Sequence, residues 1–270
     1  MPGMPEISPH GRGRGRAGAG LDTVRGVDHD ARIDAVEREL GAFVEAIGAG
    51  PLDARVPTCP DFSVDELAAH VGQFCGFWSH VLCEGTGRPK TPFADDAGTD
   101  GRTAWLEGLA SSLVTELRAT PPDTEVWTWY EPDRSAAFVA RRCSHELAVH
   151  RVDAQLARGA ADPVDPAIAA DGIDEIFVLL SSERARASSR GGNGETLHLH
   201  GTDLDDAEWL ITLDSDGVRV DHAHAKADLA LRGPVNDLEM LLYQRPVVGV
   251  VERFGDESVL DAFHRVFTFV

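Results

Sequence analysis

One carboxylate and two histidines in this sequence have the residue types and spacing of ligands for a divalent metal ion. Glu146 and His150 lie four residues apart, so on a helix they share one face. His70 lies in a different segment whose apolar residues also recur at helical spacing. Each residue falls within the apolar stripe of its segment, so we expect all three side chains to point into a bundle core. Burial of such groups is costly without compensation, which a metal ion would supply.

Two histidines and one glutamate are also the ligand set of catalytic zinc sites that keep a fourth position open. Two simpler interpretations compete with this one. A Glu–His pair four residues apart is commonly a surface hydrogen bond, and a lone histidine on an apolar stripe is commonly an ordinary core residue. The pattern of residues alone leaves these alternatives open.

The segments that must position these residues have the apolar periodicity of helices. Spacings of three and four predict helices over about 27–47, 63–84, 102–119, 135–158 and 166–182. Ser63 and Glu66 predict a capping box at the start of the second helix. Beyond residue 190 the period becomes two. That change predicts strands over 195–200, 209–213, 218–221, 227–232 and 247–251, with helices from 234 and over 256–267.

The expected fold class is therefore α + (α+β), an antiparallel four-helix bundle followed by a small α+β domain. We expect the bundle to cover residues 27–188 and the second domain to cover 195–270. The Gly-, Arg- and Pro-rich stretch 1–26 is expected to be a disordered leader. Its composition indicates no role.

Charge and composition exclude several classes of protein. Twenty-five basic against 45 acidic residues give a net charge of −20, which repels nucleic acid and anionic membranes. No apolar run approaches about 18 residues, and the first residues lack the apolar core of a secretory signal. The four cysteines show no CxxC spacing, so we expect reduced thiols and a cytoplasmic protein. The sequence indicates no oligomeric state.

Several longer motifs resemble the mycothiol-dependent maleylpyruvate isomerase family, within the DinB-like superfamily. They are VPTCPDFSVDELAAH at 56–70, RRCSHELAVHRVDA at 141–154, ADLALRGP at 227–234 and DLEMLLYQR at 237–245. The resemblance extends from about residue 30 to the end. In the last motif Tyr243 and Gln244 stand where the family more usually has Trp-Gly.

The resemblance implies a DinB-like bundle with one divalent ion, zinc being the first choice, held by His70, Glu146 and His150. It implies mycothiol as cofactor, with a metal-bound thiolate as nucleophile. The activity would be maleylpyruvate-type cis–trans isomerisation or thiol S-transfer, so the partners would be a low-molecular-weight thiol and a small electrophile. Arg245 matches an arginine that faces the family's substrate cleft, and we expect it to bind an anionic substrate.

Other interpretations remain for several residues. Arg142 and Arg151 are alternative substrate-binding cations, although ion pairs on the helix surface are the expected role of both. A cysteine hydrolase built on Cys143 lacks an oxyanion motif. The main competing function is a metal- or thiol-binding regulatory protein of the same fold without turnover.

The carboxy-terminal half contains two further histidine pairs. Residues two apart on a strand face the same side, so the pairs at 198 and 200 and at 222 and 224 could together make a second metal site. The favoured interpretation is that all four histidines are solvated.

Overall fold

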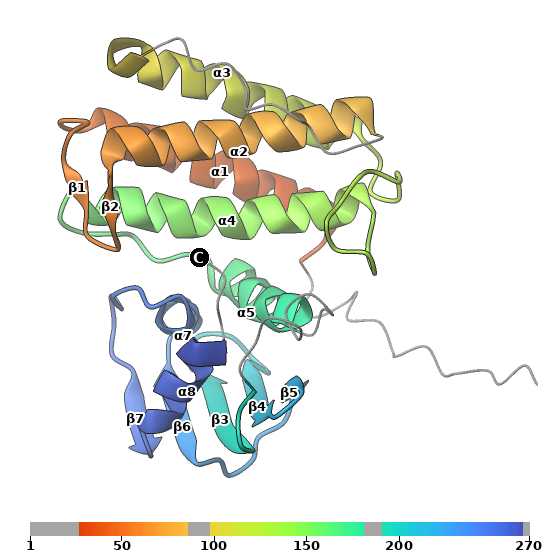
Figure 1. Ribbon diagram of the computed structural model, residues 1–270, viewed down its shortest axis with the longest axis vertical. Helices are drawn as coiled ribbons and strands as arrows, with labels where there is room; N and C mark the ends of the chain where they lie inside the picture. The colour runs from red at the N-terminus through yellow and green to blue at the C-terminus, as the bar shows by residue number, and fades with distance from the viewer. Residues whose placement is uncertain (1–26, 86–97, 181–190, 267–270) are drawn as a thin grey trace, which may run out of the picture.

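The computed structural model describes residues 27–85, 98–180 and 191–266. The expected leader, 1–26, lies outside the described residues. Four helices form the upper layer in Figure 1: α1 (His29–Gly48), α2 (Val64–Glu84), α3 (Gly98–Ala119) and α4 (Ala136–Leu156). Helix α1 packs on α4 and α3, and α2 packs on α3 and α4. No helix in the described ranges is long and apolar enough to cross a membrane.

Local capping interactions define where the bundle helices begin. The Ser63 hydroxyl accepts a hydrogen bond from the Glu66 backbone, and the Glu66 carboxylate accepts one from the Ser63 backbone at 2.7 Å. This confirms the predicted capping box. Helix α4 begins after Ser135, whose side chain caps the Phe138 N–H. Capping therefore fixes the registers of the two helices that carry His70, Glu146 and His150.

A short ribbon between α1 and α2 was not predicted from the sequence. Its strands are β1 (Arg55–Val56) and β2 (Cys59–Ser63), paired antiparallel. Strands this short carry too few alternating residues for a recognisable period. The ribbon brings Thr58 and Cys59 against Asp153 of α4, so it forms one wall of the region described below.

A five-stranded sheet forms the lower layer. Its strands are β3 (Glu195–Gly201), β4 (Glu208–Asp214), β5 (Gly217–Asp221), β6 (Leu229–Gly233) and β7 (Glu252–Gly255), in the order β5-β4-β3-β6-β7. β3 and β6 are parallel and the other neighbouring pairs are antiparallel. Helices α7 (Val235–Leu242) and α8 (Ser258–Val266) complete this part.

The predicted strand at 247–251 is wrong, because the edge strand is β7, which begins at Glu252. The backbone N–H groups of Val248 and Gly249 donate to the carboxylate of Asp237 instead of to a neighbouring strand. Val248 and Val250 are 56% and 77% exposed, so these two apolar residues stay outside the core, whereas Val251 packs against it.

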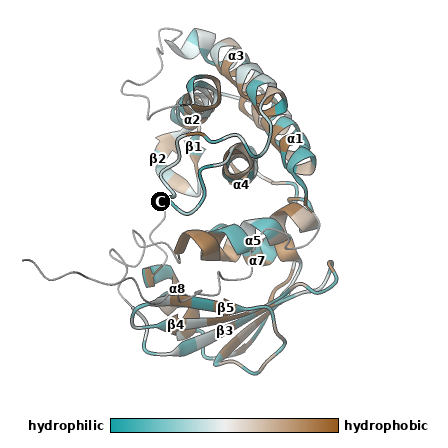
Figure 2. Ribbon diagram, turned by 90° about the vertical axis from the view of Figure 1, so that its right-hand side faces the viewer, coloured by the Kyte–Doolittle hydropathy of each residue, from teal (hydrophilic) through white to brown (hydrophobic). Residues whose placement is uncertain are grey.

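Helix α5 (Pro166–Leu180) lies between the bundle and the sheet in both ribbon views (Figures 1 and 2). Its buried apolar residues, including Ile173, Ile176 and Phe177, belong to the same hydrophobic cluster as Leu197 and Trp209 of the sheet. Trp209 Nε1 also donates to Asp174 of α5 at 2.6 Å. Helix α5 therefore shares its core with the sheet while it contacts α4 on its other side.

Candidate metal centre

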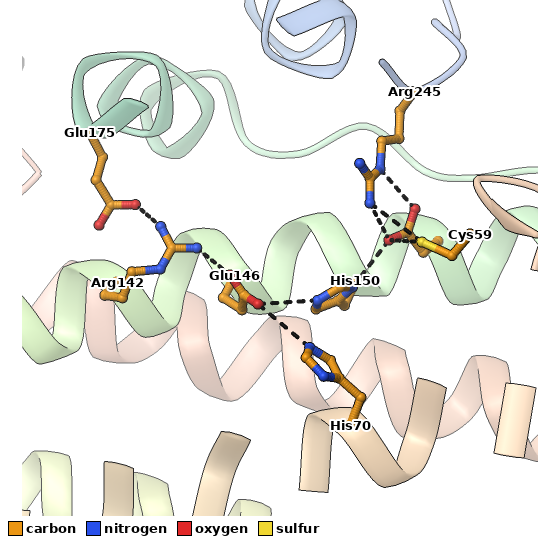
Figure 3. Close-up of polar contacts among 8 residues, drawn as sticks. Cys59, His70, Arg142, Glu146, His150, Glu175 and Arg245 are labelled. Carbon is orange, nitrogen blue, oxygen red and sulfur yellow. Dashed lines mark hydrogen bonds and ion pairs between the residues drawn. The ribbon is translucent and has the colours of Figure 1, made fainter. Parts of the chain in front are cut away.

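Three candidate ligands from two helices converge at the surface of the bundle that faces α5 and α7. Nε2 of His150 lies 3.2 Å from Oε1 of Glu146, and Nε2 of His70 lies 3.7 Å from the same oxygen. One ligand atom from each residue lies within 4.8 Å of the other two. Figure 3 shows His70 reaching this point from α2 while Glu146 and His150 reach it from α4. The structure thus brings together the three residues that the sequence singled out.

The expectation that all three side chains point into the bundle core is wrong for His70. Its side chain is 43% exposed, against 26% for Glu146 and 12% for His150. The fully buried stripe of α2 includes Leu67 and Val71, and His70 lies beside that stripe rather than on it. The site is therefore at the rim of the bundle, where a small molecule can reach it from solvent.

An arginine forms an ion pair with the Glu146 carboxylate oxygen that the two histidines do not contact. Arg142 pairs with Glu146 through Nη2 and with Glu175 of α5 through Nη1 (Figure 3). Burial opposes ionisation of Glu146, but the Arg142 charge and the hydrogen bonds from His150 and His70 hold its pKa well below the usual range. Glu146 is thus a carboxylate, the form in which it can bind a metal ion.

Arg142 and Arg151 are both in ion pairs, as expected, but not on the helix surface. The side chain of Arg142 is 10% exposed, and that of Arg151 is 4% exposed and pairs with the equally buried Glu39 at 2.7 Å. Each guanidinium is enclosed by carboxylates or carbonyls of this chain. Neither is placed to receive a substrate anion.

Asp153 orients His150 and was missed in the sequence. Its carboxylate Oδ2 lies 3.1 Å from Nδ1 of His150, which leaves Nε2 directed at Glu146. Thr58 donates to Oδ1 of the same carboxylate at 2.6 Å. A carboxylate behind a histidine commonly fixes the tautomer and ring orientation of a metal ligand. The signal was present in the three-residue spacing between His150 and Asp153 on one helix.

Arg245 reaches the same carboxylate from the other half of the molecule. Its Nε lies 3.1 Å from Oδ1 of Asp153 and its Nη2 lies 3.0 Å from Oδ2. Nη1 donates to the Tyr243 carbonyl and Nη2 contacts Sγ of Cys59 at 3.6 Å. Arg245 therefore contacts the metal centre through Asp153, without touching His70, Glu146 or His150.

The residue before Arg245 has an unusual backbone conformation. Gln244 has φ of 60°, in the left-handed region that glycine adopts readily and glutamine does not. A glycine at this position, as expected from the resembling motif, would adopt this conformation without a steric penalty. The turn that directs Arg245 towards Asp153 needs a positive φ at position 244, whichever residue occupies it.

The donor set fits a divalent metal ion. Two imidazole nitrogens and one carboxylate oxygen lie close enough to be bridged by a single ion, and this combination suits zinc as well as nickel or iron. Glu146 supplies negative charge, and Asp153 holds one imidazole in place. His70, Glu146 and His150 are thus the residues that would hold the ion.

Cys143 and its neighbours do not form a hydrolase site. The thiol is fully buried, and burial raises its pKa well above the usual value. His145 is also buried, and its Nε2 bonds Asp171 of α5 at 2.9 Å. No thiolate is therefore available at this position for nucleophilic attack.

Comparison with known proteins supports the resemblance. Residues 33–155 match the family described as the mycothiol maleylpyruvate isomerase N-terminal domain. The structure is similar to that of the mycothiol-dependent maleylpyruvate isomerase, with a TM-score of 0.54 and 15% identity over 84% of this chain and 92% of that chain. The structure of a histidine-to-alanine variant of the mycothiol-dependent maleylpyruvate isomerase is also similar. Its TM-score is 0.53, with 14% identity over 79% of this chain and 88% of that chain. No curated protein matches the chain in sequence.

These findings confirm the predicted family resemblance and fold class. At identities this low, the structural likeness establishes a shared fold and leaves the activity to be argued from the site. The match in sequence covers the bundle helices, and the likeness in structure extends over the sheet as well.

Proposed function

From the match of residues 33–155 to the family described as the mycothiol maleylpyruvate isomerase N-terminal domain, we propose that this protein is a metal- and mycothiol-dependent enzyme. It would act on a small electrophilic metabolite, either as a maleylpyruvate-type cis–trans isomerase or as a thiol S-transferase. The observation that carries the proposal is the convergence of His70, Glu146 and His150 from two helices onto one point at the bundle rim. Zinc is the metal we propose.

The bound ion would supply one kind of chemistry, which is to lower the pKa of a thiol so that it is present as the nucleophilic thiolate. The residues of this chain prepare the site for it. Arg142 holds Glu146 and keeps it ionised, and Asp153 fixes the ring of His150. The exposure of His70 provides the open side from which thiol and substrate arrive.

Arg245 is the residue we propose for binding an anionic substrate. Four of the five N–H donors of a guanidinium have acceptors in the Asp153, Tyr243 and Cys59 contacts. The fifth, on Nη1, has no acceptor among the described residues and is available for a substrate carboxylate. Its side chain is 17% exposed, so a small anion can reach it.

The decisive experiment compares the parent protein with His150→Ala. We expect the parent to isomerise maleylpyruvate, or to form a thioether, in the presence of mycothiol. We expect His150→Ala to lose one equivalent of zinc and the activity while its far-ultraviolet circular dichroism stays helical. His80→Ala, which removes an exposed histidine of the same bundle, is the control and should keep both. A His150→Ala protein that retains its metal and its activity would show that the site is wrongly assigned.

The product distinguishes the remaining possibilities. An isomerase returns the thiol unchanged, whereas an S-transferase consumes one thiol for each substrate. Metal binding with neither product would indicate the regulatory protein without turnover. The division of the chain at 27–188 and 195–270 is also part of the proposal, as two structural parts that share the core around α5 rather than as independently folding units. So is a cytoplasmic location, which agrees with four cysteines that form no disulfide.

A further inference from the structure

A second group of histidines surrounds a carboxylate on the sheet, far along the chain from the bundle site. Nε2 of His198 contacts Oε2 of Glu208. Nδ1 of His200 and Nδ1 of His224 lie 2.6 and 3.1 Å from Oε1 of the same residue. The His224 ring is 5.0 Å from that of His198 and 5.8 Å from that of His200, centroid to centroid. Three imidazoles therefore share one carboxylate.

The strand register explains how two of these histidines meet Glu208. His200 of β3 lies directly opposite Glu208 of β4 in the antiparallel pair. His198 is two residues earlier, so it lies on the same face and diagonal to Glu208, within reach of a long side chain. Leu197 and Leu199 alternate with them and are fully buried on the other face. The histidines therefore occupy the polar face of the sheet.

The third histidine arrives on the connection between β5 and β6. Because the strand order is β5-β4-β3-β6, the chain after Asp221 must cross β4 and β3 before it enters β6. The contact between His224 and Glu208 places this crossing on the polar face. The His224 side chain is 74% exposed, whereas that of His198 is 5% exposed. The expectation that His198 is solvated is therefore wrong.

Ligand atoms of three residues are close enough to be bridged by one ion. One nitrogen or oxygen from each of His198, Glu208 and His224 lies within 4.8 Å of the other two. A groove beside the cluster is lined by Asp203, Asp205 and Asp206 together with Arg232, so the charge of its lining is negative on balance.

We propose that His198, Glu208 and His224 form a second metal site, which binds a divalent first-row transition ion such as Zn²⁺, Co²⁺ or Ni²⁺. Imidazole with a single carboxylate favours these ions over Mg²⁺ and Ca²⁺, which prefer oxygen ligands. His200 hydrogen-bonds the Glu208 carboxylate through Nδ1 and is a positioning residue. The ion ties the β5–β6 connection to β3 and β4. This site shares no residue with the bundle site, so it does not depend on the proposed activity.

The test uses the full-length protein with His150→Ala as background, so that the bundle site does not contribute. Apoprotein is titrated with Co²⁺, followed by its visible absorption, and with Zn²⁺ by calorimetry. We expect one equivalent to bind. We expect the added His224→Ala substitution to weaken metal binding at least about tenfold. Substitution of a residue that only hydrogen-bonds a metal ligand already lowers metal affinity by about that factor. Because His224 is on an exposed connection, this variant should fold normally.

His222→Ala is the matched control. His222 lies two residues earlier on the same connection, where it contacts the Glu208 backbone carbonyl and Asp174. It is not one of the three residues whose ligand atoms gather within 4.8 Å. The protein with the added His222→Ala substitution should bind Co²⁺ with the same affinity as the His150→Ala background protein. Glu208→Gln, which keeps the side-chain shape, should weaken binding as His224→Ala does. Equal Co²⁺ affinity in His224→Ala and His222→Ala, or no binding by the background protein, would overturn the proposal.

Discussion

Asp153 lies fully buried, 3.1 Å from Nδ1 of His150, one turn further along the same helix. The carboxylate is shared, since Thr58 and Arg245 also donate to it. Burial opposes its ionisation, but the hydrogen bonds from His150 and Arg245 hold its pKa far below the usual value. One ionised group thus connects a candidate metal ligand to the candidate substrate-binding residue.

Replacing this carboxylate should weaken the metal site without removing a ligand. Asp153→Asn keeps the size of the side chain but loses the charge that orients His150. We expect about 10- to 100-fold weaker zinc binding at the bundle site, measured by competition with a chromophoric chelator. Asp162→Asn, beyond the end of α4, should bind zinc as the parent does. Unchanged zinc affinity in Asp153→Asn would show that Asp153 does not support His150.

Arg245→Ala should impair substrate use and leave the metal in place. The His150–Asp153 and Thr58–Asp153 contacts do not involve Arg245. Loss of a charge-assisted hydrogen bond predicts a rise in KM of roughly 10- to 100-fold for an anionic substrate. Arg245→Lys, which keeps the positive charge, should show a smaller rise in KM than Arg245→Ala. The measurements are steady-state kinetics and elemental mass spectrometry, and a parallel loss of zinc would contradict the substrate-binding role.

Asp171 should make the stability of the protein sensitive to acid. It is 1% exposed on α5 and contacts Arg32 of α1 and both Arg141 and His145 of α4. Burial alone would raise its pKa, but the hydrogen bond and charge of His145, with the two arginines, hold the pKa well below the usual value. A carboxyl whose pKa is lowered by folding stabilises the folded state above its unfolded pKa.

Asp171→Asn should therefore be less stable than the parent by about 3 kcal/mol at neutral pH. The difference should shrink as the pH falls below about 4, the unfolded pKa of aspartate. There the unfolded parent takes up a proton on Asp171 while the folded parent keeps the charge, which favours unfolding of the parent. Denaturant unfolding of both proteins at a series of pH values measures this difference in the free energy of unfolding. A difference that stays constant down to pH 3 would show that the charge of Asp171 is not what stabilises the fold.

Gln244→Gly should stabilise the protein. The positive φ at this position costs a non-glycine residue roughly 1 to 2 kcal/mol, part of which is offset by the greater unfolded-state entropy of glycine. We expect a gain of about 0.5 to 1 kcal/mol in the free energy of unfolding, measured with urea. Gln244→Ala, which keeps a Cβ atom, should give no gain. Equal effects of the two substitutions would argue against backbone strain.

The sequence predicted those features that depend on local periodicity. Helix α4 with its Glu146–His150 pair, and helix α2, follow from apolar spacing and from the Ser63 cap. The exposure of His70 on α2 did not follow from that spacing. Features that depend on distant partners were missed. Glu208 could not be linked with His198 before the β3–β4 register was known. The predicted strand at 247–251 is wrong because the side chain of Asp237, on the preceding helix, accepts hydrogen bonds from the backbone of this segment, a contact that apolar periodicity does not reveal.

The position of α5 has a consequence for how the molecule unfolds. Its apolar side packs into the core of the sheet, and Asp171 and Glu175 on the same helix pair with arginines of α1 and α4. Loss of either layer therefore exposes groups that the other needs, so heating should melt the chain in one cooperative transition. A fragment that ends after Leu180 retains α5 without its apolar partners and should aggregate rather than behave as an autonomous bundle.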